Sequence, residues 1–269
     1  MKIIYSKNEL IKIIRKDKNL GFVPTMGGIH IGHISLIKRS INQCKKTIVS
    51  IFINRPQFNK KSDFKKYPRN ISTDIFKLKK LRVDLLYLPK AKHIYPKGRN
   101  KNIKIHPFSK KLCGKYRPGH FEAVVDVVER FIKIIKPKKI YFGEKDMQQL
   151  KIVEDFIKKN YSKTKLVPCK TIREKNGLAL SSRNFLLSSR QKVIASKIFN
   201  LLRNIKKKTI KNKSLLNYAR DTIYSFGVKK IDYVEILDIN KIIRPYKKRK
   251  KYKIFIAYYL GSTRLIDNI

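Results

Sequence analysis

The first 170 residues alternate short, wholly apolar runs with longer amphipathic stretches, and this alternation limits the possible folds more than any other feature. The apolar runs have the length and composition of buried strands, and they cover residues 20–23, 47–53, 84–88, 140–142 and 166–169. Between them apolar residues recur at helical spacing, as in Ile34, Ile37 and Ile41. Strands that alternate with helices predict crossover connections, and therefore an α/β fold with a parallel sheet and helices on both faces.

The pattern changes near Leu178, where a smaller α+β unit is expected to begin. Helices are predicted over 189–208 and 215–226, followed by strands over 231–239 and 252–260. We therefore expect two domains, residues 1–177 and residues 178–269. At the other end of the chain, Ser6 and Glu9 have the spacing of a capping box, which predicts a helix with Leu10, Ile11, Ile13 and Ile14 on its buried side.

The formal net charge of +48 arises from 66 Lys and Arg against 18 Asp and Glu. A charge of this size suggests a nucleic acid or an anionic membrane as partner. The cations are scattered along the chain, however, with only short runs such as 247–251. Scatter of this kind is typical of a Lys-rich solvated surface, so we expect no nucleic-acid partner.

The cysteines and the N-terminus bear on the compartment. Cys44, Cys113 and Cys169 are far apart and lack metal-ligand spacing, which favours reduced thiols in a cytoplasmic protein. The first 16 residues interrupt their apolar positions with charges, so no signal peptide is expected. No apolar run approaches the roughly 18 residues of a membrane span, so no membrane partner is expected.

The most informative polar motif reads PTMGGIHIGH, from Pro24 to His33, between a predicted strand and a predicted helix. Gly27 and Gly28 permit a tight turn and a close approach of the backbone to a ligand. The following helix N-terminus offers free N–H groups and a positive dipole end, which suit phosphate. His30 and His33 are three residues apart, so both imidazoles can face one side and donate hydrogen bonds to triphosphate oxygens.

Five further motifs occur along the chain, and each alone fits an ordinary polar loop or helix cap as well as a ligand site. They are SIFINRPQF at 50–58, YPR at 67–69 with Asp74 beyond it, GKYRPGHF at 114–121, FGEKDMQQL at 142–150 and REKNGLALSSRN at 173–184. The Gln57 amide can donate and accept, which suits a small hydroxy acid or an amine. Lys145 can reach phosphate oxygens, and Asp146 either caps a helix or lies near nucleotide-bound Mg²⁺.

Together the six motifs resemble the pantothenate synthetase (pantoate–β-alanine ligase) family, and the HIGH-type histidines resemble the wider nucleotidyltransferase superfamily. The resemblance runs from Phe22 to Asn184 and returns in LIDN at 265–268. Two departures stand out: Arg55 replaces a family proline, and Asn176 replaces a family aspartate. Family membership implies a Rossmann-like first domain, a small C-terminal lid domain, a homodimer, and the substrates ATP, pantoate and β-alanine with Mg²⁺.

The resemblance also implies which residues form the site. It gives His33, His30 and Lys145 as catalytic residues, with His33 as proton donor. ATP would contact Met26, Gly27, Gly28, Ile29, His30, Ile31, Gly32, His33, Gly143, Glu144, Lys145, Asp146, Ile172, Leu180, Ser181, Ser182 and Arg183. Pantoate and β-alanine would be held by Gln57 and Gln149. No protein side chains are assigned as metal ligands.

The expected reaction condenses pantoate with β-alanine and releases AMP and pyrophosphate through a pantoyl adenylate. One alternative is another nucleotidyltransferase, whose product would retain the nucleotide. The other is a basic nucleic-acid-binding protein, which would need clustered basic or aromatic surface.

The charge distribution gives a prediction that distinguishes the expected ligase from a nucleic-acid-binding protein. Binding to DNA or RNA should be weak, independent of sequence, and steeply lost as salt is added, because scattered cations contribute only through counterion release. Filter binding or fluorescence anisotropy across a salt series measures this. Tight binding that persists at physiological salt would contradict the prediction.

Overall fold

The computed structural model describes residues 1–209, 212 and 214–269, and its larger unit is a six-stranded sheet in which every strand pair is parallel. The strand order is β1-β4-β3-β2-β5-β6. The strands are β1 (Lys2–Ile4), β2 (Leu20–Thr25), β3 (Lys46–Ile51), β4 (Leu85–Tyr87), β5 (Lys139–Gly143) and β6 (Lys165–Cys169). This confirms the parallel sheet predicted from the apolar runs.

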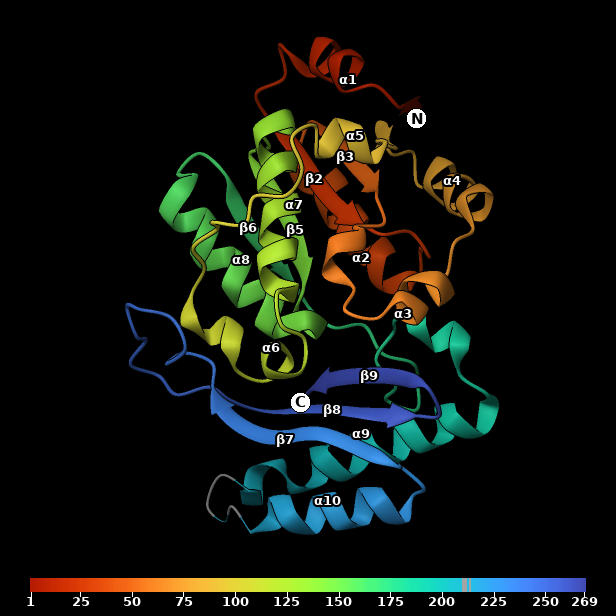
Figure 1. Ribbon diagram of the computed structural model, residues 1–269, viewed down its shortest axis with the longest axis vertical. Helices are drawn as coiled ribbons and strands as arrows, with labels where there is room; N and C mark the ends of the chain where they lie inside the picture. The colour runs from red at the N-terminus through yellow and green to blue at the C-terminus, as the bar shows by residue number, and fades with distance from the viewer. Residues whose placement is uncertain (210–211, 213) are drawn as a thin grey trace.

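Helices cover both faces of this sheet, as predicted (Figure 1). Those that connect or flank the strands are α1 (Lys7–Ile14), α2 (Ile31–Gln43), α3 (Lys61–Lys66), α4 (Ile71–Lys80), α5 (Ala91–Ile94), α6 (Cys113–Tyr116), α7 (His120–Ile135) and α8 (Met147–Asn160). The short 3₁₀ turns are η1 (Arg55–Gln57), η2 (Pro107–Lys110), η3 (Glu144–Asp146) and η4 (Ser182–Leu186).

Alternate residues of each strand enter two separate cores, which explains why the strands are apolar throughout. On one face, Phe22 and Ile140 pack with α1, α7 and α8. On the other face, Val23 and Tyr141 pack with α2 and α4. The helix α7 is the largest contributor to the first core because twelve of its residues are buried.

A second, three-stranded antiparallel sheet follows, in the order β7-β8-β9. It consists of β7 (Lys230–Asp238), β8 (Tyr252–Leu260) and β9 (Thr263–Asn268), with α9 (Ser189–Thr209) and α10 (Leu215–Ser225) packed on it. The helices lie on the side away from the larger unit (Figure 1). Tyr233, Phe255 and Ala257 of the small sheet join the core of the larger unit, so the two sheets are packed against each other.

The predicted capping box at the first helix is wrong. Ser6 precedes α1, but its side chain makes no capping hydrogen bond. The Glu9 carboxylate pairs instead with Lys2, at 3.1 Å from its ammonium nitrogen. Only Leu10 and Ile14 of α1 are fully buried, and Ile11 is 38% exposed because it lies about 100° around the helix from Leu10. Among the described residues, no helix combines the length and apolarity needed to cross a membrane.

The topology fixes where a ligand should bind. The chain passes from β2 to β3 and β4 on one side, then crosses back to β5 on the other side of β2. In parallel sheets ligands bind beyond the carboxyl ends of the strands at such a switch point. The PTMGGIHIGH motif follows β2 and the FGEKD motif follows β5, so the two best candidate motifs meet there.

Candidate functional site

A cavity of about 310 Å³ opens at this switch point, between the parallel sheet and the small sheet. Most of the sequence-predicted site residues line it, namely Met26, His30, Gly32, His33, Gln57, Gly143, Lys145, Asp146, Gln149, Ile172, Leu180, Ser181, Ser182 and Arg183. The structure therefore brings together residues from four motifs that lie far apart in the chain. The volume is within the range usual for small-molecule sites.

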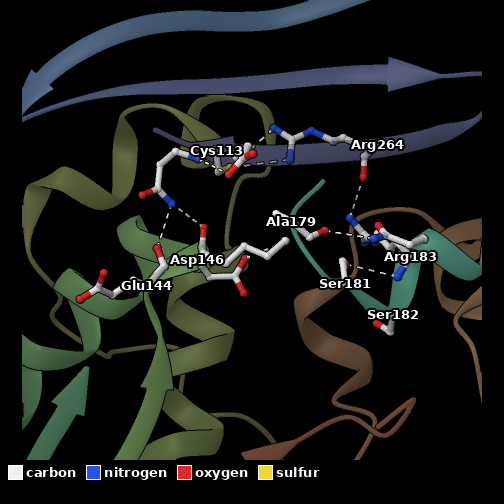
Figure 2. Close-up of polar contacts among 12 residues, drawn as sticks. Cys113, Glu144, Asp146, Ala179, Ser181, Ser182, Arg183 and Arg264 are labelled. Carbon is white, nitrogen blue, oxygen red and sulfur yellow. Dashed lines mark hydrogen bonds and ion pairs between the residues drawn. The ribbon is translucent and has the colours of Figure 1, made fainter. Parts of the chain in front are cut away.

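Five predicted ATP contacts do not line the cavity: Gly27, Gly28, Ile29, Ile31 and Glu144. Ile29 is fully buried in the protein, and Ile31 is 62% exposed on the outer surface. The Glu144 side chain points away from Ser181, Ser182 and Arg183 (Figure 2). These five residues lie off the cavity wall, and their contact with ATP stays a prediction.

The glycine turn is closed by a buried carboxylate rather than left open. Gly27 and Gly28 adopt φ angles of +83° and +64°, which favour glycine. This conformation points the N–H groups of Gly28 and Ile29 at Asp74, which accepts them at 2.8 and 2.7 Å. These two N–H groups are therefore not available to a ligand, whereas the predicted close approach of the turn to a ligand stays a prediction. Asp74, which the sequence alone left without a role, holds the turn that leads to the histidines.

The two histidines lie together at the start of α2, as predicted, with ring centroids 4.1 Å apart. His30 caps the helix, because its Nδ1 accepts the N–H of Gly32 at 3.1 Å. Nδ1 is thus unprotonated, and Nε2 carries the proton of the neutral ring. The Nδ1 atom of His33 is buried and has no hydrogen-bond partner among the described residues.

Both imidazoles are held neutral by their surroundings. Burial, reinforced by the charge of Lys145, lowers the pKa of His30 to about 4. Burial, with His30 and Lys145 as further causes, lowers the pKa of His33 to about 3. At neutral pH the site therefore offers two uncharged imidazoles beside the cationic side chain of Lys145.

Lys145 follows β5 directly and lies on η3. Its side chain is only 17% exposed, and its ammonium nitrogen is 3.7 Å from an oxygen of Asp146. Asp146 precedes α8 but makes no capping hydrogen bond with its side chain. Of the two roles predicted for Asp146, capping is therefore wrong.

Gln57 lies on η1 with its amide against Met26. Its Nε2 is 2.9 Å from the Met26 sulfur, and its Oε1 accepts a hydrogen bond from Asn54 at 3.1 Å. Arg55, which replaces the family proline, donates to the carbonyl of Phe58 at 3.0 Å and so stabilises the same turn. The departure at Arg55 leaves Gln57 on the cavity wall.

Two residues of the GKYRPGHF motif bind the backbone carbonyl of Gln57, a role that the sequence did not reveal. His120 Nδ1 donates to the Gln57 carbonyl at 2.9 Å, because a carbonyl can only accept. The Nε2 atom of His120 then accepts from Arg117 at 3.0 Å, and Arg117 also donates to the Gln57 carbonyl at 3.1 Å. Burial beside Arg117 places the pKa of His120 well below its usual range, which keeps this arrangement neutral at the ring.

The Ser181–Arg183 loop forms the opposite wall. Ser182 shares a hydrogen bond with Tyr67 at 3.1 Å, and Ser181 accepts the N–H of Arg183 (Figure 2). The Arg183 guanidinium, predicted to clamp phosphate, is paired with Asp63 at 2.7 Å. Its charge is therefore already partly neutralised when no ligand is present.

The small sheet forms a further wall of the cavity through residues of β9. Arg264 donates to Asp232 at 2.8 Å, and both its terminal nitrogens lie 3.6 Å from the Cys113 sulfur (Figure 2). The Cys113 sulfur is in turn 3.0 Å from the Tyr233 hydroxyl. The contacts of Cys113 thus join α6 of the larger unit to β7 and β9 of the small sheet.

No group of three or more His, Cys, Asp or Glu side chains that could hold a metal ion occurs within residues 1–209, 212 and 214–269. Asp146 is a single carboxylate on the cavity wall and is 47% exposed. Mg²⁺ commonly binds through one or two carboxylates and the phosphates of a nucleotide. The residues present fit a metal ion that enters with its nucleotide.

Known proteins resemble the chain along its whole length. The sequence model of the family Pantoate-beta-alanine ligase matches residues 2–269. A pantothenate synthetase from Flavobacterium psychrophilum is 38% identical, with 99% of each chain covered. One from Caldicellulosiruptor saccharolyticus is 37% identical, covering 99% of this chain and 96% of the relative.

Solved structures agree with the sequence relatives. Pantothenate synthetase from Thermus thermophilus superposes with a TM-score of 0.91 at 30% identity, covering 100% of this chain and 99% of its own. Pantoate-beta-alanine ligase from Francisella tularensis, solved with beta-gamma ATP and beta-alanine, gives a TM-score of 0.85 at 38% identity. The coverage there is 100% of this chain and 97% of the other.

The Asp74 contact gives a prediction about the glycine turn. Asp74→Ala should lower the free energy of unfolding by about 1–3 kcal/mol, the usual cost of buried N–H groups left without a partner. It should also raise the KM for ATP, because His30 and His33 follow the turn directly. Urea unfolding and initial rates measure the two effects.

Asp84→Ala is the matched control, since Asp84 accepts the N–H of Thr47 at 2.8 Å at the opposite end of the sheet. It should lower stability without changing the KM for ATP. A KM for ATP raised equally in both variants would contradict the assignment.

The lowered histidine pKa values give a prediction about pH. Between about 3 and 6.5 the unfolded chain binds a proton at His33 that the folded chain does not. The free energy of unfolding should therefore fall as the pH is lowered through this range, and His33→Asn should reduce that fall. Urea unfolding at a series of pH values measures it. Identical pH profiles for the variant and the wild type would show that His33 titrates normally in the folded protein.

Proposed function

Because the chain belongs to the pantoate-beta-alanine ligase family, which its match over residues 2–269 shows, we propose that it joins pantoate to β-alanine through an enzyme-bound pantoyl adenylate. The chain is a pantothenate-forming ligase that uses ATP. The observation that best supports the adenylate route is the convergence of His30, His33, Lys145 and the Ser181–Arg183 loop on one cavity.

We place the triphosphate of ATP between the His30–His33 face of α2 and the loop that carries Ser181, Ser182 and Arg183. Lys145 lies on the same wall and supplies a cation. Pantoate would bind against Gln57 and Gln149, with β-alanine entering beside Gln57. The phosphates of the ligand would compete with Asp63 for the Arg183 guanidinium. They would also place negative charge beside the neutral imidazoles of His30 and His33.

The first step needs no general base, because the pantoate carboxylate is ionised at neutral pH. One carboxylate oxygen attacks the α-phosphorus, and the bond from that phosphorus to the bridging oxygen of pyrophosphate breaks. The developing negative charge is stabilised by preorganised donors, here the N–H groups of His30 and His33 and the ammonium of Lys145.

The second step transfers the acyl group. The β-alanine amine attacks the activated acyl carbon, the bond to the AMP oxygen breaks, and AMP leaves while the new amide loses a proton. A proton-donor role for His33 agrees poorly with its pKa of about 3, so we propose that it acts as a neutral hydrogen-bond donor.

Mg²⁺ would be held by the nucleotide phosphates, and Asp146 on the cavity wall would be available as a protein carboxylate. It would supply further charge neutralisation at the phosphates. The protein's own part is to orient the nucleotide with the histidines and Lys145 and to exclude water.

We also propose the remaining features that the resemblance implies. The chain would divide into a Rossmann-like domain at 1–177 and a lid domain at 178–269, since the second core includes Leu178 together with α9 and α10. It would work as a homodimer in the cytoplasm, without a nucleic-acid or membrane partner. The three cysteines, all free thiols in the structure, agree with a reducing compartment.

The adenylate route predicts a burst. ATP and pantoate without β-alanine should give about one equivalent of pyrophosphate per site and no steady AMP release, because the site shields the adenylate from water. Added β-alanine should convert the bound adenylate to pantothenate and AMP. Rapid-quench measurement of pyrophosphate and AMP decides the matter. If neither appears until β-alanine is present, a concerted route replaces the adenylate, and a product that keeps the nucleotide would indicate another transferase.

A further inference from the structure

The last strand of the chain contacts the turn that carries Lys145. Asn268, at the end of β9, is only 2% exposed. Its amide nitrogen donates to the carbonyl oxygens of Glu144 and Lys145, each at 2.8 Å. One side chain from the small sheet thus binds two consecutive carbonyls of the larger unit.

The orientation of this amide is determined by its neighbours. Lys253 on β8 donates to the Asn268 oxygen at 2.6 Å. Because a lysine ammonium can only donate, the oxygen of the amide must face Lys253 and the nitrogen must face the two carbonyls.

The strand itself is anchored on both sides of Asn268. The Asp267 carboxylate accepts two hydrogen bonds from Arg173, at 2.7 and 2.8 Å, in the paired geometry that arginine favours. Ile269 exchanges two backbone hydrogen bonds with Ile254 of β8. Asn268 is therefore held by contacts that do not involve Lys145, so it can act as a fixed support.

The support acts where the direction of Lys145 is decided. Strand β5 ends at Gly143 and α8 begins at Met147, so the short turn η3 between them sets the backbone at Lys145. With both of its first two carbonyls bound, this turn cannot rotate without losing buried hydrogen bonds. The Lys145 side chain then projects onto the cavity wall beside His30.

We propose that Asn268 is a positioning residue for Lys145: docking of β9 on the Glu144–Lys145 turn aims the lysine at the phosphates, so adenylation requires the small sheet in place. This inference rests on the proposed role of Lys145 in adenylation. Asn268 also lies on the cavity wall, but in this scheme it acts through Lys145.

The test is a double-mutant cycle on the pyrophosphate burst, using the full-length protein with saturating ATP and pantoate. Asn268→Asp keeps the shape and the acceptor for Lys253 but removes both donors. It should slow the burst by about 10–100-fold, the scale expected when a catalytic group is misplaced by about 1 Å. The KM for ATP should change much less. In a Lys145→Ala background, Asn268→Asp should have almost no further effect.

Asn240→Asp is the matched control, because its amide also donates to a backbone carbonyl, that of Arg249 at 2.6 Å, on the exposed loop after β7. It should leave the burst unchanged. Circular dichroism and Tm verify folding, and if Asn268→Asp lowers the Tm, Asn268→Ser serves instead. That variant keeps one donor without adding charge and should give an intermediate burst rate.

The outcomes separate the two proposals. A normal burst in Asn268→Asp together with a slow burst in Lys145→Ala would overturn the positioning role and leave the proposed function intact. Equal slowing by Asn268→Asp in both backgrounds would also overturn it, because the effect would not act through Lys145. A normal burst in Lys145→Ala would instead refute the proposed role of the lysine, and the positioning role would fall with it.

Discussion

The site depends first on one buried carboxylate, that of Asp74. Two glycines with positive φ turn the chain so sharply after β2 that two N–H groups point away from the cavity. Asp74, 2% exposed, accepts both and so fixes the turn to α4. Lys77, one turn further along α4, also donates to the carbonyl of Ile29 at 2.6 Å. The start of α2, and with it the pair of histidines, is therefore held by a helix that comes later in the chain, after β3.

In the proposed binding mode, the N–H groups of Gly28, Ile29 and Gly32 are therefore not available to the triphosphate. The Gly32 N–H, which would otherwise be free for a phosphate, is taken by His30 itself. Burial and the nearby Lys145 keep both imidazoles neutral, so the site avoids three adjacent positive charges. A polyanion that enters will favour protonation of the same rings. The positive charge on the two histidines would thus be largest when the triphosphate is bound, which is when developing negative charge must be stabilised.

The sequence was sufficient for the parallel sheet and for most of the cavity wall, because strand periodicity and strand-end motifs are local signals. The capping box was wrong, since Ser6 makes no capping hydrogen bond and Glu9 pairs with Lys2. The sequence also did not indicate that Asp63, 120 residues away, pairs with Arg183. The strands β1 and β9 were not predicted: β1 has only three residues, and β9 reads TRLIDN, in which polar residues outnumber apolar ones. The role of the GKYRPGHF motif, support of the Gln57 carbonyl, likewise depends on a contact between residues 63 apart.

The scarcity of acidic residues gives these contacts further meaning. Only 18 carboxylates face 66 cationic side chains, yet several of them pair with arginines of this one cavity and its rim. Asp63 pairs with Arg183, Asp232 with Arg264, and Asp267 with Arg173. Each pair joins segments that are far apart in sequence: the second ties β7 to β9, and the third ties β9 to the segment that follows β6. Additional lysines are tolerated wherever solvent can hydrate them. Replacing a carboxylate that pairs with one of these arginines is different, because it would leave a mostly buried cation unpaired. The acidic residues at the site therefore mark the positions where the fold depends on ion pairs. The net charge of +48 reflects the many cationic side chains of the chain and gives no information about these positions.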